Sequence, residues 1–287
     1  MPRTARRLLT GAVLALTLAA SLLTSGCSSA RPSSITTIVP GTLRACLYPG
    51  FKPFAYKDGG TWKGWDVDYL SAFAQANHLT FEPVEAKSFE DIWLRPGKNE
   101  CDVAASGISD TEARRKASGT AARWSATYYT VVRAFLVRTA DAGNLTDIGD
   151  LRGKTVIVTL GSTADYDLRN RMAQAGMTEK DVAIQGTDDE EQAADLVRKG
   201  SAFAYGGGYG SVKLLATDGL TVVWPHCNLT SVGDGAFTPY SEPFSFVVRA
   251  KSTGLTSAID AYIPGHKYAG TPNPSSVACP SPPWAGR

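Results

Sequence analysis

Short apolar runs, which predict buried strands, alternate along the chain with segments in which apolar residues recur at helical spacing. Within residues 66–78, Val67, Leu70, Phe73 and Ala74 lie on one face of a predicted helix. The same alternation predicts strands at residues 43–47, 79–84, 102–106 and 131–138, and the start of a helix at residues 89–94. These elements predict an α/β lobe.

A second series of elements begins after residue 150. It predicts strands at residues 155–159, 182–185, 202–205 and 220–224, and helices at residues 163–175, 188–199 and 212–216. An extended run at residues 243–249 and a helix at residues 255–263 follow, after which Pro, Gly and Ser dominate. The chain therefore predicts two α/β lobes in tandem, with ligand sites where loops at the strand ends face one another.

Residues 105–114 join a short buried strand to a new helix. Ser109 and Glu112 have the spacing of a capping box, so we expect the helix to begin there. The first N–H groups of a helix have no intrahelical partner and carry the positive end of its dipole, and Arg114 adds a full charge one turn later. We expect this corner to bind an anion such as a carboxylate. A capped surface helix with a solvated Arg is the alternative.

The N-terminal segment has the pattern of a secretion signal. Three Arg residues precede an apolar run at residues 8–23, which small residues end just before Cys27. The segment resembles a bacterial lipoprotein signal, although Thr24 stands where an aliphatic residue is usual. We expect residues 1–26 to be removed, Cys27 to carry a lipid, and residues 27–40 to form a flexible tether. An ordinary secretory signal with a chance cysteine is the alternative.

The composition argues against several classes of function. The chain has 29 basic and 27 acidic residues, and three of the Arg lie in the expected signal, so the processed protein is nearly neutral. No basic stripe remains to predict nucleic-acid binding. The chain has three His, at scattered positions, so we expect neither a metal site nor another cofactor.

Four cysteines remain when Cys27 is set aside, and an even number in an oxidising compartment favours disulfides. Four cysteines allow three pairings. Cys46 lies in the first predicted strand and Cys101 just before the strand expected beside it, so we expect these two to pair. Cys227 and Cys279 lie in late, irregular segments, and their pairing would pin the Pro-rich tail.

Four stretches, in this order and spacing, carry a resemblance to a known family. They are Gly41-Thr42-Leu43-Arg44 leading to Pro53-Phe54; Gly64-Trp65-Asp66-Val67-Asp68; Ser109-Asp110-Thr111-Glu112-Ala113-Arg114; and Asp150-Leu151-Arg152-Gly153-Lys154 followed by Leu160-Gly161-Ser162-Thr163. The chain resembles the family 3 solute-binding proteins of ABC importers, which mostly capture polar amino acids outside the cell, over residues 41–263. The resemblance implies an α/β, two-lobed periplasmic-binding-protein-like fold of type II, with two crossings between the lobes.

The resemblance also implies how the chain is divided. Residues 41–136 and 241–287 would form the first lobe, and residues 137–240 the second. We expect the crossings near residues 135–139 and 237–243. Closure of the two lobes around the ligand would complete the site.

The family's ligand-binding positions can be carried over residue by residue. The aromatic wall falls on Phe51 and Phe89, for which core packing is the alternative. The second lobe contributes Ser162 and Thr163, for which a simple helix cap is the alternative. The carboxylate clamp, in which the Arg would form a bidentate pair, falls on Ser106, Gly107, Ser109 and Arg114.

The chain departs from the family where an acid usually binds the α-ammonium of the ligand. That position is Gly208 here, and Phe203 replaces a second usual acid. Because a buried ammonium needs a partner, we expect Asp110 or Asp165 to supply it. Alternatively, the ligand has a carboxylate but no free α-ammonium, and the glycines at 206–208 make room for a bulkier group.

The resemblance implies a lipid-anchored, monomeric extracellular protein that captures a small polar carboxylate-bearing ligand, an amino acid in the first place, for a membrane permease. No catalytic residues are expected, since His226 and Cys227 are neighbours on an extended segment and point to opposite faces. Two other interpretations stay open: a ligand-binding sensor lipoprotein, and a dehydratase-type enzyme on the same fold.

Overall fold

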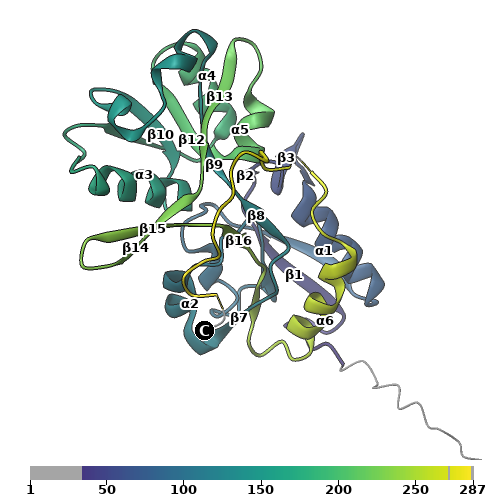
Figure 1. The fold of residues 1–287 in the computed structure, drawn as a ribbon. Helices are drawn as coiled ribbons and strands as arrows, with labels where there is room; N and C mark the ends of the chain where they lie inside the picture. Colours follow the sequence, from purple (N-terminus) through teal and green to yellow (C-terminus); the bar gives the residue numbers. More distant parts are fainter. Residues whose placement is uncertain (1–33, 271, 286–287) are drawn as a thin grey trace, which may run out of the picture. The chain divides into compact units, whose positions relative to one another are not determined.

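The computed structural model describes residues 34–270 and 272–285. The expected signal and the lipidation site at Cys27 lie outside these residues. Within the described ranges the chain forms two mixed five-stranded sheets, each covered by helices (Figure 1). This is the α/β fold of two-lobed periplasmic binding proteins, as the sequence predicts.

The first sheet has the strand order β5-β1-β6-β17-β7. The strands β5 and β6 flank β1 in parallel, whereas β17 runs antiparallel to β6 and β7. The bounds of the elements in and around this sheet are β1 Thr42–Leu47, β2 Gly50–Phe51, β3 Ala55–Asp58, β4 Thr61–Lys63, α1 Trp65–Ala76, β5 Thr80–Glu85, η1 Ile92–Leu94, β6 Val103–Ala104, α2 Glu112–Ser118, η2 Gly119–Ala121, β7 Ala122–Trp124, β17 Val247–Arg249, α6 Leu255–Tyr262 and η5 Ile263–Gly265.

The second sheet has the strand order β11-β10-β12-β9-β13, with β9 antiparallel to both of its neighbours. A hairpin of β14 and β15 follows β13. The bounds are β9 Arg133–Arg138, η3 Thr139–Asn144, η4 Ile148–Leu151, β10 Thr155–Thr159, α3 Thr163–Gln174, β11 Ala183–Thr187, α4 Glu190–Arg198, β12 Ala204–Gly208, α5 Tyr209–Leu215, β13 Leu220–His226, β14 Asn228–Gly233 and β15 Ala236–Tyr240.

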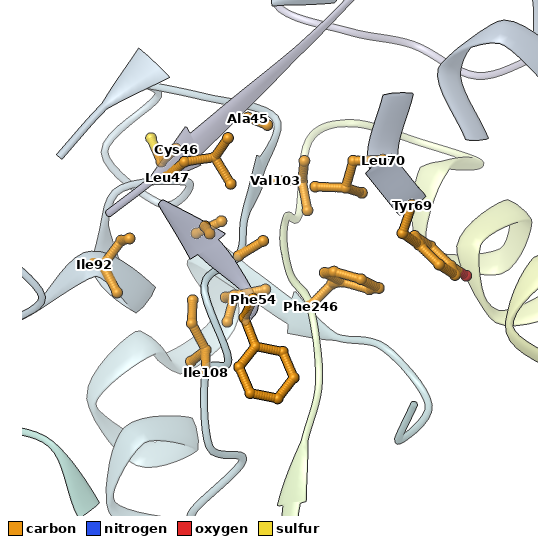
Figure 2. Packing of buried hydrophobic residues seen from close by; sticks show 14 of the residues in the cluster. Ala45, Cys46, Leu47, Phe54, Tyr69, Leu70, Ile92, Val103, Ile108 and Phe246 are labelled. Atoms are coloured by element: carbon orange, nitrogen blue, oxygen red, sulfur yellow. The ribbon is translucent and has the colours of Figure 1, made fainter. Parts of the chain in front are cut away.

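Burial of alternating apolar residues organises both lobes. The helix α1 places Val67, Leu70 and Phe73 on the first sheet, as its spacing predicts. Figure 2 shows this core, in which side chains from β1, β6 and α1 meet Phe246. The second sheet has a separate cluster on each face, so both of its faces are buried.

The chain crosses between the lobes at a small antiparallel ladder. It consists of β8 (Tyr129–Val131) and β16 (Glu242–Phe244), with Glu242 opposite Val131. The first crossing therefore lies between β8 and β9, a few residues before the expected 135–139. The expectation was wrong because the apolar run at residues 131–138 reads as one strand, whereas its main part, β9, is an interior strand of the second sheet.

Hydrogen bonds join the two lobes along the edges that face each other. The Tyr48 hydroxyl donates to the backbone oxygen of Asp188 at 2.6 Å. The Lys52 N–H donates to the Glu190 carboxylate at 3.2 Å, and the Ser211 hydroxyl donates to the backbone oxygen of Lys52. In this structure the lobes are in contact, so groups that line the surface between them are removed from bulk water.

Two disulfides join Cys46 to Cys101 and Cys227 to Cys279, which are the pairs that the sequence predicts. The first links β1 to the segment before β6. The second holds the C-terminal tail against the start of β14. The tail continues along the crossing, where the Asn273 side chain donates to the backbone oxygen of Thr130 at 2.7 Å.

Candidate ligand-binding site

The expected start of the helix at Ser109 is wrong. The helix α2 begins at Glu112, and its N-cap is Thr111, whose hydroxyl accepts the Arg114 N–H at 3.2 Å. Ser109 instead pairs through its backbone with Phe244 of β16. The Ser109 hydroxyl contacts side chains of Thr163 and Glu242 and does not cap the helix.

The buried carboxylate of Asp66 holds the backbone of Ser106 and Gly107. Its Oδ2 accepts their N–H groups at 2.7 and 2.8 Å, and Tyr128 Oη at 3.2 Å. Burial raises the pKa of Asp66 to about 6, although these hydrogen bonds favour the charged form. The Ser106 hydroxyl accepts the Tyr48 N–H at 2.9 Å. Two of the four predicted clamp residues are therefore engaged within the first lobe.

Gly107 is required by the close approach of an aromatic ring. Its φ is +60°, and a Cβ at this position would lie 2.8 Å from the Phe51 ring. Phe51 in turn stacks on Phe89, with ring centroids 5.5 Å apart and an angle of 25° between the planes. Both predicted wall residues are thus adjacent, but they contact each other directly and must separate to admit a ligand between them.

The hydroxyls of Ser109 and Thr163 are held by a carboxylate of the protein itself, Glu242. Thr163 Oγ1 donates to Glu242 Oε1 at 2.6 Å, and the Ser109 hydroxyl is in close contact with the same oxygen. The two hydroxyls are 2.9 Å apart although they come from different lobes. An amide nitrogen of Asn228 donates to the other oxygen of Glu242. Ser109 of the predicted clamp and Thr163 of the second lobe therefore bind a side-chain carboxylate of the protein.

Arg133 neutralises Glu242. Its Nε donates to Glu242 Oε2 at 2.9 Å, and its Nη2 contacts both Glu242 Oε1 and the Thr163 hydroxyl. Both side chains are buried, with exposed fractions of 3% and 0%. Burial lowers the pKa of Arg133, and the adjoining carboxylate outweighs this effect and raises it. The register of the second sheet places Arg133 opposite Gly208, the position of the family's missing acid.

The glycines at 206–208 do not leave open space for a bulky ligand. A Cβ on Gly206 would lie 3.0 Å from the Phe135 ring, and one on Gly208 would lie 2.9 Å from a methyl group of Val131. Neighbouring side chains of the protein fill the volume. The alternative in which these glycines enlarge the ligand site is therefore wrong for this structure.

Arg114 is the charged residue of the predicted clamp. It has no ion-pair partner among the described residues. Its side chain is 3% exposed, and it donates to the backbone oxygens of Ser109 at 3.1 Å and of Gly161 at 2.9 Å, one in each lobe. Its Nε has no hydrogen-bond partner in the described part of the chain. Burial lowers its pKa to about 10, so the side chain remains a cation at pH 7.

The remaining predicted site residues hold the local structure. Ser162 is the N-cap of α3, and its hydroxyl accepts the Asp165 N–H at 3.3 Å. The two acids expected near the ligand's ammonium are already paired, Asp165 with Arg169 at 2.7 Å and Asp110 with Arg115 at 2.5 Å. Asp165 thus pairs with an arginine of its own helix, α3, and Asp110 with an arginine of the helix that follows it, α2.

Sequence reasoning missed Glu242 and Arg133, although a signal for both exists. Arg133 is the one charged residue within the apolar stretch from residue 131 to residue 137, and Glu242 precedes the apolar stretch from residue 243 to residue 248. A lone charge in a buried strand needs a partner of opposite sign. Pairing the two lone charges was possible from the sequence alone.

The described residues hold no cluster of three or more His, Cys, Asp or Glu side chains arranged for a metal ion. Among the helices of residues 34–270 and 272–285, none is long and apolar enough to span a bilayer. Arg114 is a buried cation in contact with both lobes, and such a cation is suited to holding an anion.

Comparison with known proteins identifies the kind of protein that this chain is similar to. Residues 43–272 match the family described as bacterial extracellular solute-binding proteins, family 3. The arginine-binding extracellular protein ArtP of Bacillus subtilis (strain 168) is 29% identical over 149 residues, which are 52% of each chain. The match thus spans about half the length of that relative.

Solved structures show the same fold over a larger share of the chain. An ancestral arginine-binding protein bound to arginine has a TM-score of 0.63 and 25% identity, covering 78% of this chain and 92% of that one. The arginine-bound, truncated ArgBP of T. maritima has a TM-score of 0.64 and 22% identity, covering 79% of this chain and 97% of that one. Both align with the two lobes described above.

Proposed function

The chain belongs to the bacterial extracellular solute-binding proteins of family 3, and from this we propose that it captures a small carboxylate-bearing solute, an amino acid or a related acid, for an ABC importer. The relatives named above are described as arginine-binding, which supports an amino-acid-like ligand. In this proposal the lobes close on the ligand, and Cys27 carries the lipid that keeps the protein on the outer face of the cell membrane, next to the permease.

One observation carries the proposal. Arg114 is buried between the lobes, contacts a backbone oxygen of each, and has no carboxylate partner among the described residues. A buried cation without an anion is costly, because the attraction of a counter-ion is what offsets the loss of water. A ligand carboxylate that reaches Arg114 would supply the counter-ion and would also touch both lobes.

The clamp in this proposal is smaller than the family's. Asp66 engages Ser106 and Gly107, and Glu242 engages Ser109 and Thr163. Arg114 is the predicted clamp residue whose charge is uncompensated. The proposal therefore assigns the ligand's carboxylate to Arg114 and leaves the two hydroxyls with Glu242.

A thermal-shift screen tests the proposed function. The protein is heated with each member of a panel of L-amino acids and of small carboxylates that lack an amino group. A ligand that binds the native state raises the melting temperature by mass action, about 2.7 kcal/mol of stabilisation at a hundred times its dissociation constant. If no carboxylate in the panel raises the melting temperature of the wild type, the proposal is wrong.

A further inference from the structure

A pocket of about 470 Å³ opens between the lobes, and Arg114 is among the residues that line it. The first lobe contributes η1 and α2 to it, and the second contributes α3 and the β14–β15 hairpin. Phe51, Phe89, Ser106 and Ser109 do not line this pocket. Of the family's ligand positions, the pocket therefore includes Arg114 and Thr163 alone.

Two buried donors at this pocket have no acceptor among the described residues. They are Nε of Arg114 and the indole Nε1 of Trp93. The guanidinium also lies over the Trp93 ring, 4.1 Å from its centroid. Glu242, whose charge acts on Arg114, is itself paired with Arg133. The charge at the base of the pocket is thus positive and without an anion of its own.

Three of the residues that line the pocket, Trp93, Tyr166 and Tyr240, are aromatic, and the lining residues other than Arg114 and Asp91 are uncharged. Trp93 and Tyr240 are buried, and Tyr166 is 48% exposed at the opening. Asn170 and Asn228 add side-chain amides. The one carboxylate among the lining residues, Asp91, is exposed. The buried part of the pocket therefore offers an anion site and ring contacts, but no acid that would hold an ammonium group.

We infer that this pocket binds a small aromatic carboxylate, with the carboxylate toward Arg114, the ring against Trp93, Tyr166 and Tyr240, and no requirement for an α-ammonium. The inference rests on the proposed function, whose ligand class and position it specifies. The Arg133–Glu242 pair also supports the inference. In the family pattern the hydroxyls of Ser109 and Thr163 would bind the ligand's carboxylate, but here both contact Glu242.

Calorimetry with matched ligands tests the inference. The probes are 3-phenylpropanoate and L-phenylalanine, which differ by the α-ammonium. We expect 3-phenylpropanoate to bind at least as tightly as the amino acid. The variant Tyr166→Ala, at a half-exposed position, should weaken its binding about tenfold or more through lost ring contact. Leu214→Ala, which removes an equally exposed side chain of the second lobe outside the pocket, should leave binding unchanged.

A second measurement locates the ligand without relying on affinity. In protein labelled with ¹⁵N at tryptophan, 3-phenylpropanoate should shift the Trp93 indole signal, assigned as the signal that Trp93→Phe removes. The inference is wrong if L-phenylalanine binds more tightly, or if a bound carboxylate leaves the Trp93 signal in place and Tyr166→Ala binds as Leu214→Ala does. In those cases the proposed function survives, because a carboxylate still binds. Absence of binding by every carboxylate of the screen overturns both.

Discussion

Replacing Glu242 by Gln should strongly destabilise the fold, because the change leaves Arg133 as a buried, unpaired cation. Glu242 has no exposed surface, and Arg133 is 3% exposed. Besides Arg133, the carboxylate accepts hydrogen bonds from Ser109, Thr163 and Asn228. Removing one partner of a buried ion pair costs about 3–5 kcal/mol. For a chain of this size the melting temperature should fall by about 6 °C or more.

The double variant Arg133→Met, Glu242→Met tests whether the loss of stability in Glu242→Gln comes from leaving one buried charge unpaired. With both charges gone, no unpaired ion remains, so the double variant should be more stable than Glu242→Gln alone. Ser109 and Thr163 can then hydrogen-bond to each other, since their hydroxyls are 2.9 Å apart. As a control, Asp58→Asn breaks the exposed pair with Lys63 and should leave the melting temperature unchanged.

The assay is urea unfolding followed by circular dichroism, together with thermal melts. If Glu242→Gln is as stable as the wild type, the reasoning is refuted. Glu242 would then not be committed to Arg133, and the hydroxyls of Ser109 and Thr163 would be free to bind a ligand's carboxylate in the family pattern. If the single variant is destabilised and the double variant is not, the pair is part of the fold.

Three further predictions concern pH, the disulfides and closure. Burial raises the pKa of Glu190 from 4.5 to about 8, so its contribution to stability is present below about pH 4.5 and is lost as the pH rises to about 8. Melts of wild type and Glu190→Gln should show a smaller loss of stability in the variant as the pH rises from about 4.5 to about 8; parallel curves would contradict this. Replacing Cys227 and Cys279 by Ser opens a loop of 52 residues and should lower the free energy of unfolding by about 4 kcal/mol. Hydrogen exchange in the C-terminal tail should become faster. A variant as stable as the wild type would contradict this prediction. Small-angle scattering should show a more compact protein with a bound carboxylate than without, and identical curves would count against closure.

Much of the fold was predictable because its elements follow from local patterns. The spacing of apolar residues located the buried face of α1, and short apolar runs located the strands of both sheets except β7. The position of the first crossing was not predictable, because the run at residues 131–138 is continuous in hydropathy. The run is divided because Val131 pairs with β16 whereas β9 pairs with β12 of the second sheet. These pairings depend on the tertiary structure and leave no mark in the local sequence.

The candidate site was predictable residue by residue but not in its bonding. The clamp, wall and cap residues lie close together, yet four of their polar groups bind Asp66 or Glu242. A motif gives residue types and their spacing. It does not show that the carboxylate of Glu242, 133 residues after Ser109, lies against the Ser109 hydroxyl. The sequence signal for this pairing was the presence of Arg133 and Glu242 as single charges in or beside apolar stretches.

The acids beside the clamp illustrate the same limit. Asp110 and Asp165 are adjacent in sequence to predicted site residues, so they were reasonable partners for an ammonium group. Each instead pairs with an arginine of the helix that it precedes or begins, at a separation of four or five residues. Asp165 and Arg169 are four residues apart in α3, and charges at that spacing meet on a helix surface whether or not a ligand is nearby.

Titration calorimetry on Arg114 variants tests the central claim most directly. The ligand is the carboxylate that gives the largest shift in the thermal screen, and the proteins are wild type, Arg114→Ala, Arg114→Lys and the control Lys116→Ala, which removes an exposed cation of the same helix. We predict that both Arg114 variants lose about 2–5 kcal/mol of binding free energy while remaining folded, and that Lys116→Ala binds as the wild type does. Wild-type affinity in both Arg114 variants would contradict the account, because the ligand's carboxylate would then bind elsewhere.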